Sequence, residues 1–436
     1  MRSDFNITDY AVFLPAINDT YARCLVTETL GNRPFPAGLS IEDLEYWNES
    51  NKLWHYPYLL HSIGNYQVGA NPDNAVTRAD RNTAVVIGDS GGYQIGQGSL
   101  KGYNALTPHM PAAAAIDAWN GADDVRSWIF GWLEANSTYA MSIDMPLWAA
   151  EEKTESPFSN CTREQLLQMT VNNLQYIDVR RQGHTKWLNV VQGIDNVATE
   201  QWWNAVKKFR WGGWALAGGA GSKGGLAQLL YAVLLMRDDG AFAEGLDWVH
   251  TLGVSELKWA IVLTAIQRNL RKTNPKLTIS FDTSSVFQQG MRRENAYVSP
   301  VLTNDAKTWV LPSESSPQSY KKVGSTEPFP FSSAIGDKMT LGHLNVQDWD
   351  AFDKRQYDNV SLLLLSNHNI WVTLDAVQRA NESAFSTNRE DNTPKLYIDC
   401  IDLIDAAFAA RDWRGFIAKN KGTFDAHSRS IYDKKS

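Results

Sequence analysis

The sequence predicts an α/β protein built as a TIM-like (β/α)8 barrel. Short apolar runs that end in Gly, Asp or Pro alternate with segments of helical periodicity, as parallel strands and their crossover helices do. Eight such runs occur, which is the number of strands that closes a barrel. The chain has 436 residues, of which 43% are hydrophobic, and this is enough for one large barrel with additional segments.

The expected elements follow one another along most of the chain. Thr162 precedes the expected helix 163–181 and is expected to be its N-cap, because its hydroxyl can accept a hydrogen bond from a free N–H group. The chemistry of such barrels lies at the C-terminal ends of the strands. The expected strands are 11–14, 58–63, 84–87, 140–143, 187–191, 214–216, 248–252 and 277–281, and the further expected helices are 199–209, 226–237, 256–271 and 362–380.

Composition and charge exclude several classes of protein. Cys24, Cys161 and Cys400 are too few and too scattered for a disulfide framework, which favours a reducing compartment. The first ten residues lack the apolar core of a signal peptide, and no run approaches the ~18 apolar residues of a membrane span. A net charge of -7 argues against a broadly basic surface for nucleic acid. We therefore expect a cytoplasmic protein without membrane contact, with any nucleic-acid contact confined to short basic clusters.

Residues 85–94, VVIGDSGGYQ, admit two interpretations. In the first, the loop 88–92 copies the surroundings of a protease nucleophile, which would be Ser90. Such a serine needs a histidine and an aspartate in a triad, and the upstream His55 and His61 stand in no protease-like context. In the second, Asp89 closes a buried strand, and the glycines after it let the backbone turn sharply around a ligand.

A family resemblance favours the second interpretation. Residues 89–94, DSGGYQ, resemble the base-binding loop of the tRNA-guanine transglycosylases, and the segments SIDMP (142–146), VQG (191–193), ALAGG (215–219), LGV (252–254) and ISFD (279–282) resemble that family in the same order. The resemblance implies that Asp282 is the nucleophile and that Asp89 transfers the proton. The base-binding residues that it implies are Ser90, Gly92, Tyr93, Asp144, Gln192, Gly218, Gly219 and Leu252.

The chemistry of these residue types suits a purine-like base. Asp144 can accept from the N–H groups of the base, and Gln192 and the backbone of Gly219 can donate to its carbonyl. Tyr93 and Leu252 are expected to cover the two faces of the base. In the tRNA enzymes a basic run after the nucleophile helps to hold RNA, and Arg292 and Arg293 are the residues of this chain expected to contact a nucleic-acid backbone.

The resemblance lapses at a metal site. Residues 362–380 resemble the closing helix of the tRNA enzymes, in which the histidine at the position of His368 binds a structural zinc with three cysteines. Those cysteines are absent here, and a lone histidine cannot complete a four-ligand zinc site. We therefore expect no bound metal, no other cofactor and a histidine satisfied by protein groups. Apolar packing is expected to hold residues 300–358 instead, through Phe329, Phe331 and Trp349.

This combination resembles the divergent relatives of phages and bacterial modification clusters that act on DNA. The expected reaction exchanges guanine in DNA for a free 7-deazaguanine base (preQ0-like) through a glycosyl ester on Asp282. Transfer to tRNA is the first alternative. A noncatalytic nucleic-acid-binding paralogue is the second, but the presence of both Asp89 and Asp282 counts against it. A carbohydrate-active barrel would lack the ordered glycine segments.

The expected organisation has four parts. These are the barrel with the active site over 8–299, a rebuilt insertion over 300–358, a closing barrel helix over 359–385 and a C-terminal extension over 386–436. A homodimer is one possible oligomeric state. For a phage-encoded protein, the compartment would be the host cytoplasm.

Overall fold

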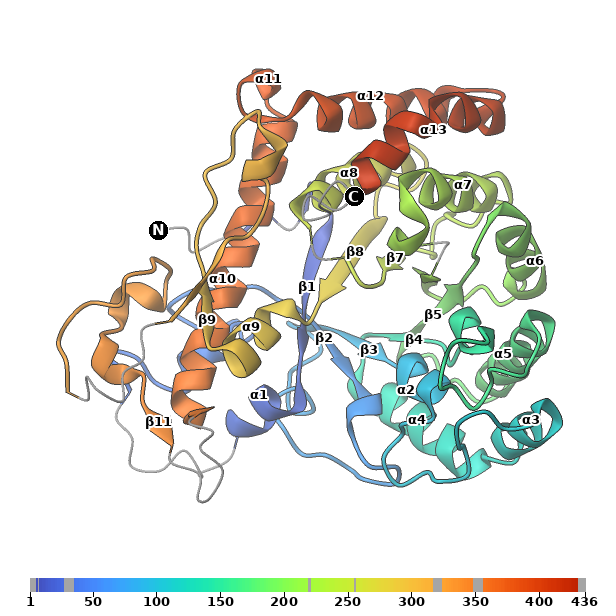
Figure 1. Ribbon diagram of the computed structural model, residues 1–436, viewed down its shortest axis with the longest axis horizontal. Helices are drawn as coiled ribbons and strands as arrows, with labels where there is room; N and C mark the ends of the chain where they lie inside the picture. The colour runs from blue at the N-terminus through green and yellow to red at the C-terminus, as the bar shows by residue number, and fades with distance from the viewer. Residues whose placement is uncertain are drawn as a thin grey trace.

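The computed structural model describes residues 5–6, 8–26, 35–218, 221–254, 256–316, 324–347 and 356–429. Eight parallel strands close into one barrel in chain order, and helices surround it (Figure 1). This confirms the predicted (β/α)8 barrel, and every expected strand overlaps an observed one. The strands are β1 (Val12–Ile17), β2 (Tyr58–Ser62), β3 (Val85–Asp89), β4 (Tyr139–Met141), β5 (Lys186–Val191), β6 (Gly213–Leu216), β7 (Trp248–Thr251) and β8 (Thr278–Thr283).

The register of the strands places two acidic residues at the same rim. β1 closes the barrel against β8 in parallel, with Leu14 opposite Asp282. β2 pairs with β3 so that Ser62 stands opposite Asp89. Because all the strands run in one direction, Asp89 and Asp282 both lie at the C-terminal end of the barrel, where the loops leave it.

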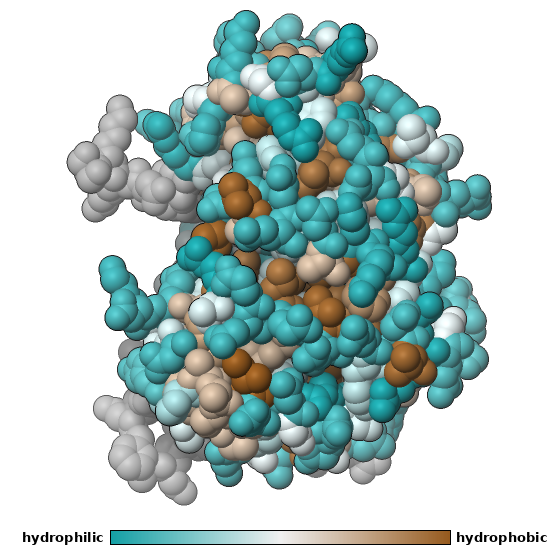
Figure 2. Space-filling model, turned by 90° about the vertical axis from the view of Figure 1, so that its right-hand side faces the viewer, coloured by the Kyte–Doolittle hydropathy of each residue, from teal (hydrophilic) through white to brown (hydrophobic). Residues whose placement is uncertain are grey.

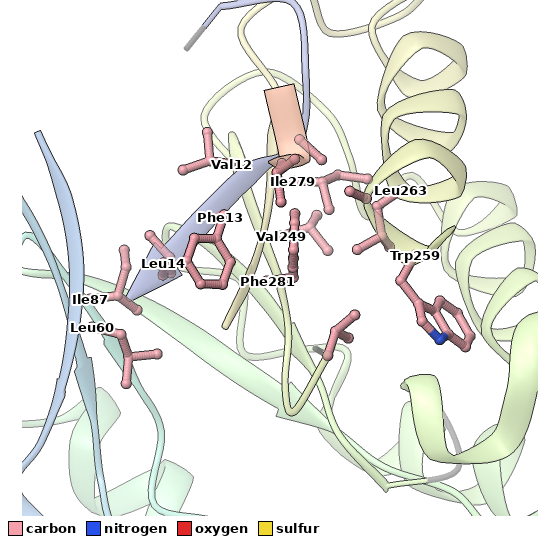
Figure 3. Close-up of a cluster of buried hydrophobic side chains, with 14 of the residues drawn as sticks. Val12, Phe13, Leu14, Leu60, Ile87, Val249, Trp259, Leu263, Ile279 and Phe281 are labelled. Atoms are coloured by element: carbon pink, nitrogen blue, oxygen red, sulfur yellow. The ribbon is translucent and has the colours of Figure 1, made fainter. Parts of the chain in front are cut away.

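The interior of the barrel is filled by side chains. The ring of Trp248 lies 5.9 Å from the ring of Tyr58 and 4.6 Å from that of Tyr139, measured between centroids. Nearer the middle, Figure 3 shows Leu14 beside Leu60 and Ile87. Tyr58 is partly buried and the other five residues are buried, so the barrel is a packed core and not a pore. The packed interior therefore leaves room for a ligand at the rim but not within the barrel.

The outer helices agree with the sequence periodicity between β4 and β8. Thr162 caps α5 as predicted: its hydroxyl accepts from the N–H of Gln165 at 3.2 Å, and Gln165 Oε1 accepts from the N–H of Thr162 at 2.8 Å. The predicted outer helices are α5 (Arg163–Asp178), α6 (Asn196–Val206), α7 (Gly225–Asp238) and α8 (Leu257–Leu270). The helices around the strands that the periodicity did not indicate are α1 (Asp19–Cys24), between β1 and β2, and α2 (Gly92–Gln97), α3 (Ala112–Asn120) and α4 (Asp123–Asn136), between β3 and β4.

After β8 the chain leaves the barrel and returns. It forms α9 (Ser285–Arg293) and the short strands β9 (Asn295–Tyr297) and β10 (Ser313–Ser315), which pair antiparallel. Further on, β11 (Val346–Gln347) pairs with β12 (Gln356–Tyr357). The long helix α10 (Asn359–Ala384) then packs against α8, α9 and β1, on the left of the barrel in Figure 1.

Aromatic packing in the insertion is confirmed in part. The ring of Phe329 lies 5.2 Å from the ring of Phe331 and 5.2 Å from that of His368 on α10. Phe329 is buried and Phe331 packs on the same core. Trp349, the third residue of this prediction, lies outside the described residues.

The C-terminal segment adds helices to the outside of the barrel. After the short α11 (Arg389–Asn392), α12 (Lys395–Ala409) packs on α8 and α13 (Trp413–Ser428) packs on α7, at the top of Figure 1. The right-hand side of Figure 1, where α5 and α6 lie, faces the viewer in Figure 2 and is mainly hydrophilic with scattered apolar patches. Among the segments that the structure describes, no helix combines the length and apolarity needed to cross a bilayer.

Candidate active site

Asp89 is held at the rim by a backbone that folds back on itself. Gly91, two residues later, has φ +80° and donates its N–H to Asp89 Oδ1 at 3.3 Å. A β-carbon on Gly91 would lie 2.7 Å from the Cα of Gly64, so only glycine allows this close approach. Burial raises the pKa of Asp89, and hydrogen bonds from Ser62 and from the Gly91 N–H oppose that effect, while the charge of Asp282 adds to it. A carboxyl in such surroundings is suited to hold and release a proton.

Asp282 is tied to strand β7 and to the loop that follows it. Its Oδ1 accepts a hydrogen bond from the N–H of Gly253 at 3.0 Å and lies 3.3 Å from Nε2 of His250. Its backbone carbonyl accepts from the N–H of Val254 at 3.0 Å. The side chain keeps 16% of its surface exposed. The carboxylate is thus held in one orientation and remains accessible from the rim.

Asp144 and Gln192 form a buried polar pair beside the first two carboxyls. The amide Nε2 of Gln192 donates to Asp144 Oδ2, while its Oε1 accepts from the N–H of Leu147 at 2.9 Å. Burial raises the pKa of Asp144 to about 7, and the charge of Asp89 contributes in the same direction. Both ends of the Gln192 amide are held by hydrogen bonds, so Gln192 orients Asp144.

Most of the predicted catalytic and base-binding residues converge on one cavity of about 410 Å³. A second cavity of about 340 Å³ shares Asp89, Tyr93, Asp282 and Ser284 with it, so the two carboxyls stand where two cavities meet. The first cavity is lined by the predicted residues Asp89, Gly92, Tyr93, Asp144, Gln192, Gly218, Leu252 and Asp282, and also by Trp148, Lys223 and Ser284. Its size is in the range of small-molecule sites.

An exposed aromatic pair stands at one side of this cavity. Tyr93 keeps 64% of its surface exposed, and its ring lies 5.5 Å from the ring of Trp148 with an interplanar angle of 42°. Leu252, a partly buried aliphatic side chain, lines the same cavity. The side chains predicted to cover the two faces of a base are therefore both at the cavity. Gly219, predicted to donate to the base, lies outside the described residues.

Ser90 is not an exposed nucleophile. It is 1% exposed, does not line either cavity at the rim, and donates its hydroxyl to the carbonyl of Ser142 at 3.1 Å. This geometry contradicts the protease interpretation of the loop, because a serine nucleophile must face its substrate. It also assigns Ser90 to support of the loop rather than to contact with a base.

Of the two arginines predicted to contact a nucleic-acid backbone, the structure places the side chain of Arg293, which does not line the rim cavities. Arg293 is exposed and lines a separate cavity with Glu256 and Trp309, next to α9. The side chain of Arg292 is outside the described part of the structure. Lys223 is instead the cation that lines the rim cavity in the described part of the chain, and the prediction had missed it.

The sequence contains signals for some of the residues that were missed. Trp148 follows Asp144 by four residues, within the same loop after β4, and Lys223 stands in a glycine-rich segment after β6. His250 lies two residues before Leu252 on an expected strand, so alternation places both on the face that lines the site.

His368 is a core histidine with both ring nitrogens satisfied. Its Nε2 donates to the carbonyl of Tyr297 at 2.9 Å, and its Nδ1 lies 2.7 Å from the hydroxyl of Ser333. Burial lowers its pKa to about 4, which keeps the ring neutral. Within the described ranges, no group of three or more His, Cys, Asp or Glu side chains is placed to hold a metal ion.

Comparison with models of known protein families gives no match, and a search of curated proteins gives no significant relative.

Proposed function

We propose that this protein is a guanine transglycosylase that exchanges guanine in DNA for a 7-deazaguanine base such as preQ0. The observation that carries the proposal is the convergence of Asp89, Asp282 and the Asp144–Gln192 pair on one cavity at the barrel rim. Three acidic groups with different surroundings can take different roles there: nucleophile, proton carrier and acceptor for the N–H groups of the base. Tyr93 and Leu252 supply apolar surface for its two faces.

In the proposed first step, Asp282 attacks C1′ of a deoxyguanosine. The C1′–N9 bond breaks as the ester bond forms, and the leaving guanine takes a proton from Asp89. The raised pKa of Asp89 favours the protonated carboxyl that this step requires. Because the reacting carbon is inaccessible within a duplex, the nucleotide must be flipped into the rim at a cost of a few kcal/mol.

In the second step the 7-deazaguanine attacks C1′ from the face of the sugar that guanine left, and it displaces the carboxylate of Asp282. Asp89, now ionised, accepts the proton that the incoming base loses at N9, and the sugar ends with its original configuration. The reaction needs no further cofactor, because the atoms and the proton balance within the two steps.

Two observations support nucleic acid, and DNA in particular, as the polymer. Lys223 supplies an exposed cation at the cavity, suited to a phosphate of the flipped nucleotide. The subdomain that carries zinc in the tRNA enzymes is rebuilt here: its three cysteines are missing, and His368 is bonded to Ser333 and Tyr297. A chain that keeps the catalytic groups while changing that subdomain is expected to act on a different polymer.

The direct test is incubation of the protein with radiolabelled guanine and either duplex DNA or bulk tRNA. We expect label in the DNA and its loss on a chase with preQ0. Label in the tRNA alone would replace DNA by tRNA as the substrate. Absence of label from both polymers, with a properly folded protein, would refute the transglycosylase assignment.

A further inference from the structure

A buried chain of side chains leads from the interior of the barrel to Asp282. His250 on β7 is 0% exposed, and its Nδ1 lies 2.9 Å from the hydroxyl oxygen of Ser280 on β8. The indole N–H of Trp248 donates to the same oxygen at 2.8 Å. At the other side of the ring, Nε2 of His250 lies 3.3 Å from Asp282 Oδ1. None of these three residues has a role in the reaction described above.

The contacts of Ser280 determine which nitrogen of His250 carries the proton. The hydroxyl oxygen accepts the Trp248 N–H, and within the described structure the partner left for its own proton is Nδ1 of His250. A neutral ring that accepts at Nδ1 carries its proton on Nε2. Nε2 makes no hydrogen bond within the described residues, but it lies 3.3 Å from Asp282 Oδ1, which can accept its proton. Contacts between catalytic groups are often long or poorly aligned before substrate binds, and they tighten in the complex.

We propose that His250 is a positioning residue for Asp282 and that it decides which carboxylate oxygen attacks. This inference rests on the proposed function. Oδ1 accepts a hydrogen bond from the Gly253 N–H at 3.0 Å and lies 3.3 Å from Nε2 of His250, which is placed to become its second donor when substrate binds. In the described residues, no hydrogen bond reaches Oδ2. Oδ2 is therefore the atom that forms the ester with C1′, and Oδ1 becomes the ester carbonyl.

Hydrogen bonds to Oδ1 affect the two steps of the reaction differently. A carboxylate oxygen carries more negative charge than an ester carbonyl, so hydrogen bonds to Oδ1 stabilise the free carboxylate more than the ester. They therefore assist the second step, in which the C1′–Oδ2 bond breaks and the electron pair returns to Asp282. Loss of the His250 donor should prolong the life of the covalent intermediate.

The test follows the covalent enzyme–DNA complex on a denaturing gel, before and after a chase with preQ0. In His250→Leu the chase should slow about tenfold to a hundredfold, which corresponds to one hydrogen bond to a charged group. His250→Gln should recover most of the rate, because the Gln amide can place an N–H where Nε2–H stands. His368→Gln is the matched control, since it removes an equally buried histidine that lines neither rim cavity, and its chase rate should equal that of the wild type.

Several outcomes would overturn the inference. An unchanged chase in His250→Leu would do so, and so would equal losses in the Leu and Gln variants. If His250→Leu does not fold, Ser280→Ala provides the test, because it removes the hydroxyl that fixes the tautomer and should slow the chase several-fold.

Nitrogen NMR of the histidines separates this inference from the proposed function, because it needs no activity. We expect a proton on Nε2 of His250 whose resonance shifts in Asp282→Asn, and a proton found on Nδ1 instead would refute the proposal even if wild-type protein transfers no base.

Discussion

The backbone of Gly92 lies directly against the carboxylate of Asp144. A β-carbon on Gly92 would stand 2.8 Å from Asp144 Oδ1, closer than side chains tolerate. Gly92→Ala should therefore displace the carboxylate that is proposed to hold the base. We expect the exchange rate to fall about tenfold or more, on the order of one misplaced polar contact, with guanine exchange into DNA as the measurement.

Gly131 provides the control for this substitution. It lies on α4, and a β-carbon there would have no atom within 4 Å. Gly131→Ala should leave activity unchanged and stabilise the protein by about 0.5 to 1 kcal/mol, because alanine loses less conformational freedom in a helix. Equal activity in both alanine variants would show that the contact between Gly92 and Asp144 is unimportant.

The raised pKa of Asp144 predicts a stability that depends on pH. The carboxyl titrates at about 7 in the folded protein and near its ordinary value of 3.8 in the unfolded chain, so the folded state binds more protons between these values. The contribution of this group to stability is then lost as the pH rises from about 4 to 7. Asp144→Asn should exceed the wild type in unfolding free energy by about 1 to 4 kcal/mol at pH 8.

The measurement is thermal unfolding of the wild type and of Asp144→Asn at several pH values. The difference between them should grow from pH 5 to pH 8 and vanish toward pH 4. Asp117→Asn, which neutralises an exposed carboxylate on α3, should show no such trend. A difference that stays constant over this range would mean that the pKa of Asp144 is not raised.

Substitution of Asp282 should abolish base exchange, whereas substitution of Ser90 should lower stability and leave base exchange in place. Asp282→Asn is nearly isosteric but cannot form the ester, so we expect base exchange to be abolished with the fold intact. Ser90→Ala removes one hydrogen bond to the carbonyl of Ser142 and should cost about 0.5 to 1.5 kcal/mol of stability with exchange retained. Exchange assays and circular dichroism on both variants check this, and full activity of Asp282→Asn would be incompatible with the proposed mechanism.

The capping box of α5 gives a prediction that is independent of function. Thr162→Ala removes the acceptor for the N–H of Gln165 and should lower the unfolding free energy by about 0.5 to 2 kcal/mol. Thr162→Ser keeps the hydroxyl and should remain close to the wild type in chemical denaturation. Equal losses in both variants would indicate that the hydroxyl does not contribute.

Strands and their ends were predictable because their signals are local. A buried parallel strand is an apolar run, and the residue that follows it lies at the rim whatever the rest of the chain does. This is why Asp89, Asp144 and Asp282 could be assigned to one end of the barrel before any geometry was known. Gln192 and Leu252 follow from the same rule.

Contacts between residues far apart in the sequence could not be predicted from local patterns. Ser90 faces the carbonyl of Ser142, and Arg293 faces a cavity beside Trp309, because of how loops and α9 fold after the strands end. The approach of His250 to Asp282 depends on the pairing of β7 with β8, and the sequence of one strand does not specify that pairing. Periodicity gives the face of a strand that a residue occupies, but the partner comes from register and packing.

The return of α10 to the barrel has a consequence for synthesis of the chain. All eight strands have emerged from the ribosome once Thr283 is free, yet the helix that packs on β1 and α8 is translated only from Asn359 onward. The seam between β1 and β8 joins residues as distant as Val12 and Ser280, so it closes late in any order of folding. A nascent chain of intermediate length would therefore expose apolar surface beside this seam, and this is where chaperones would be expected to bind during translation.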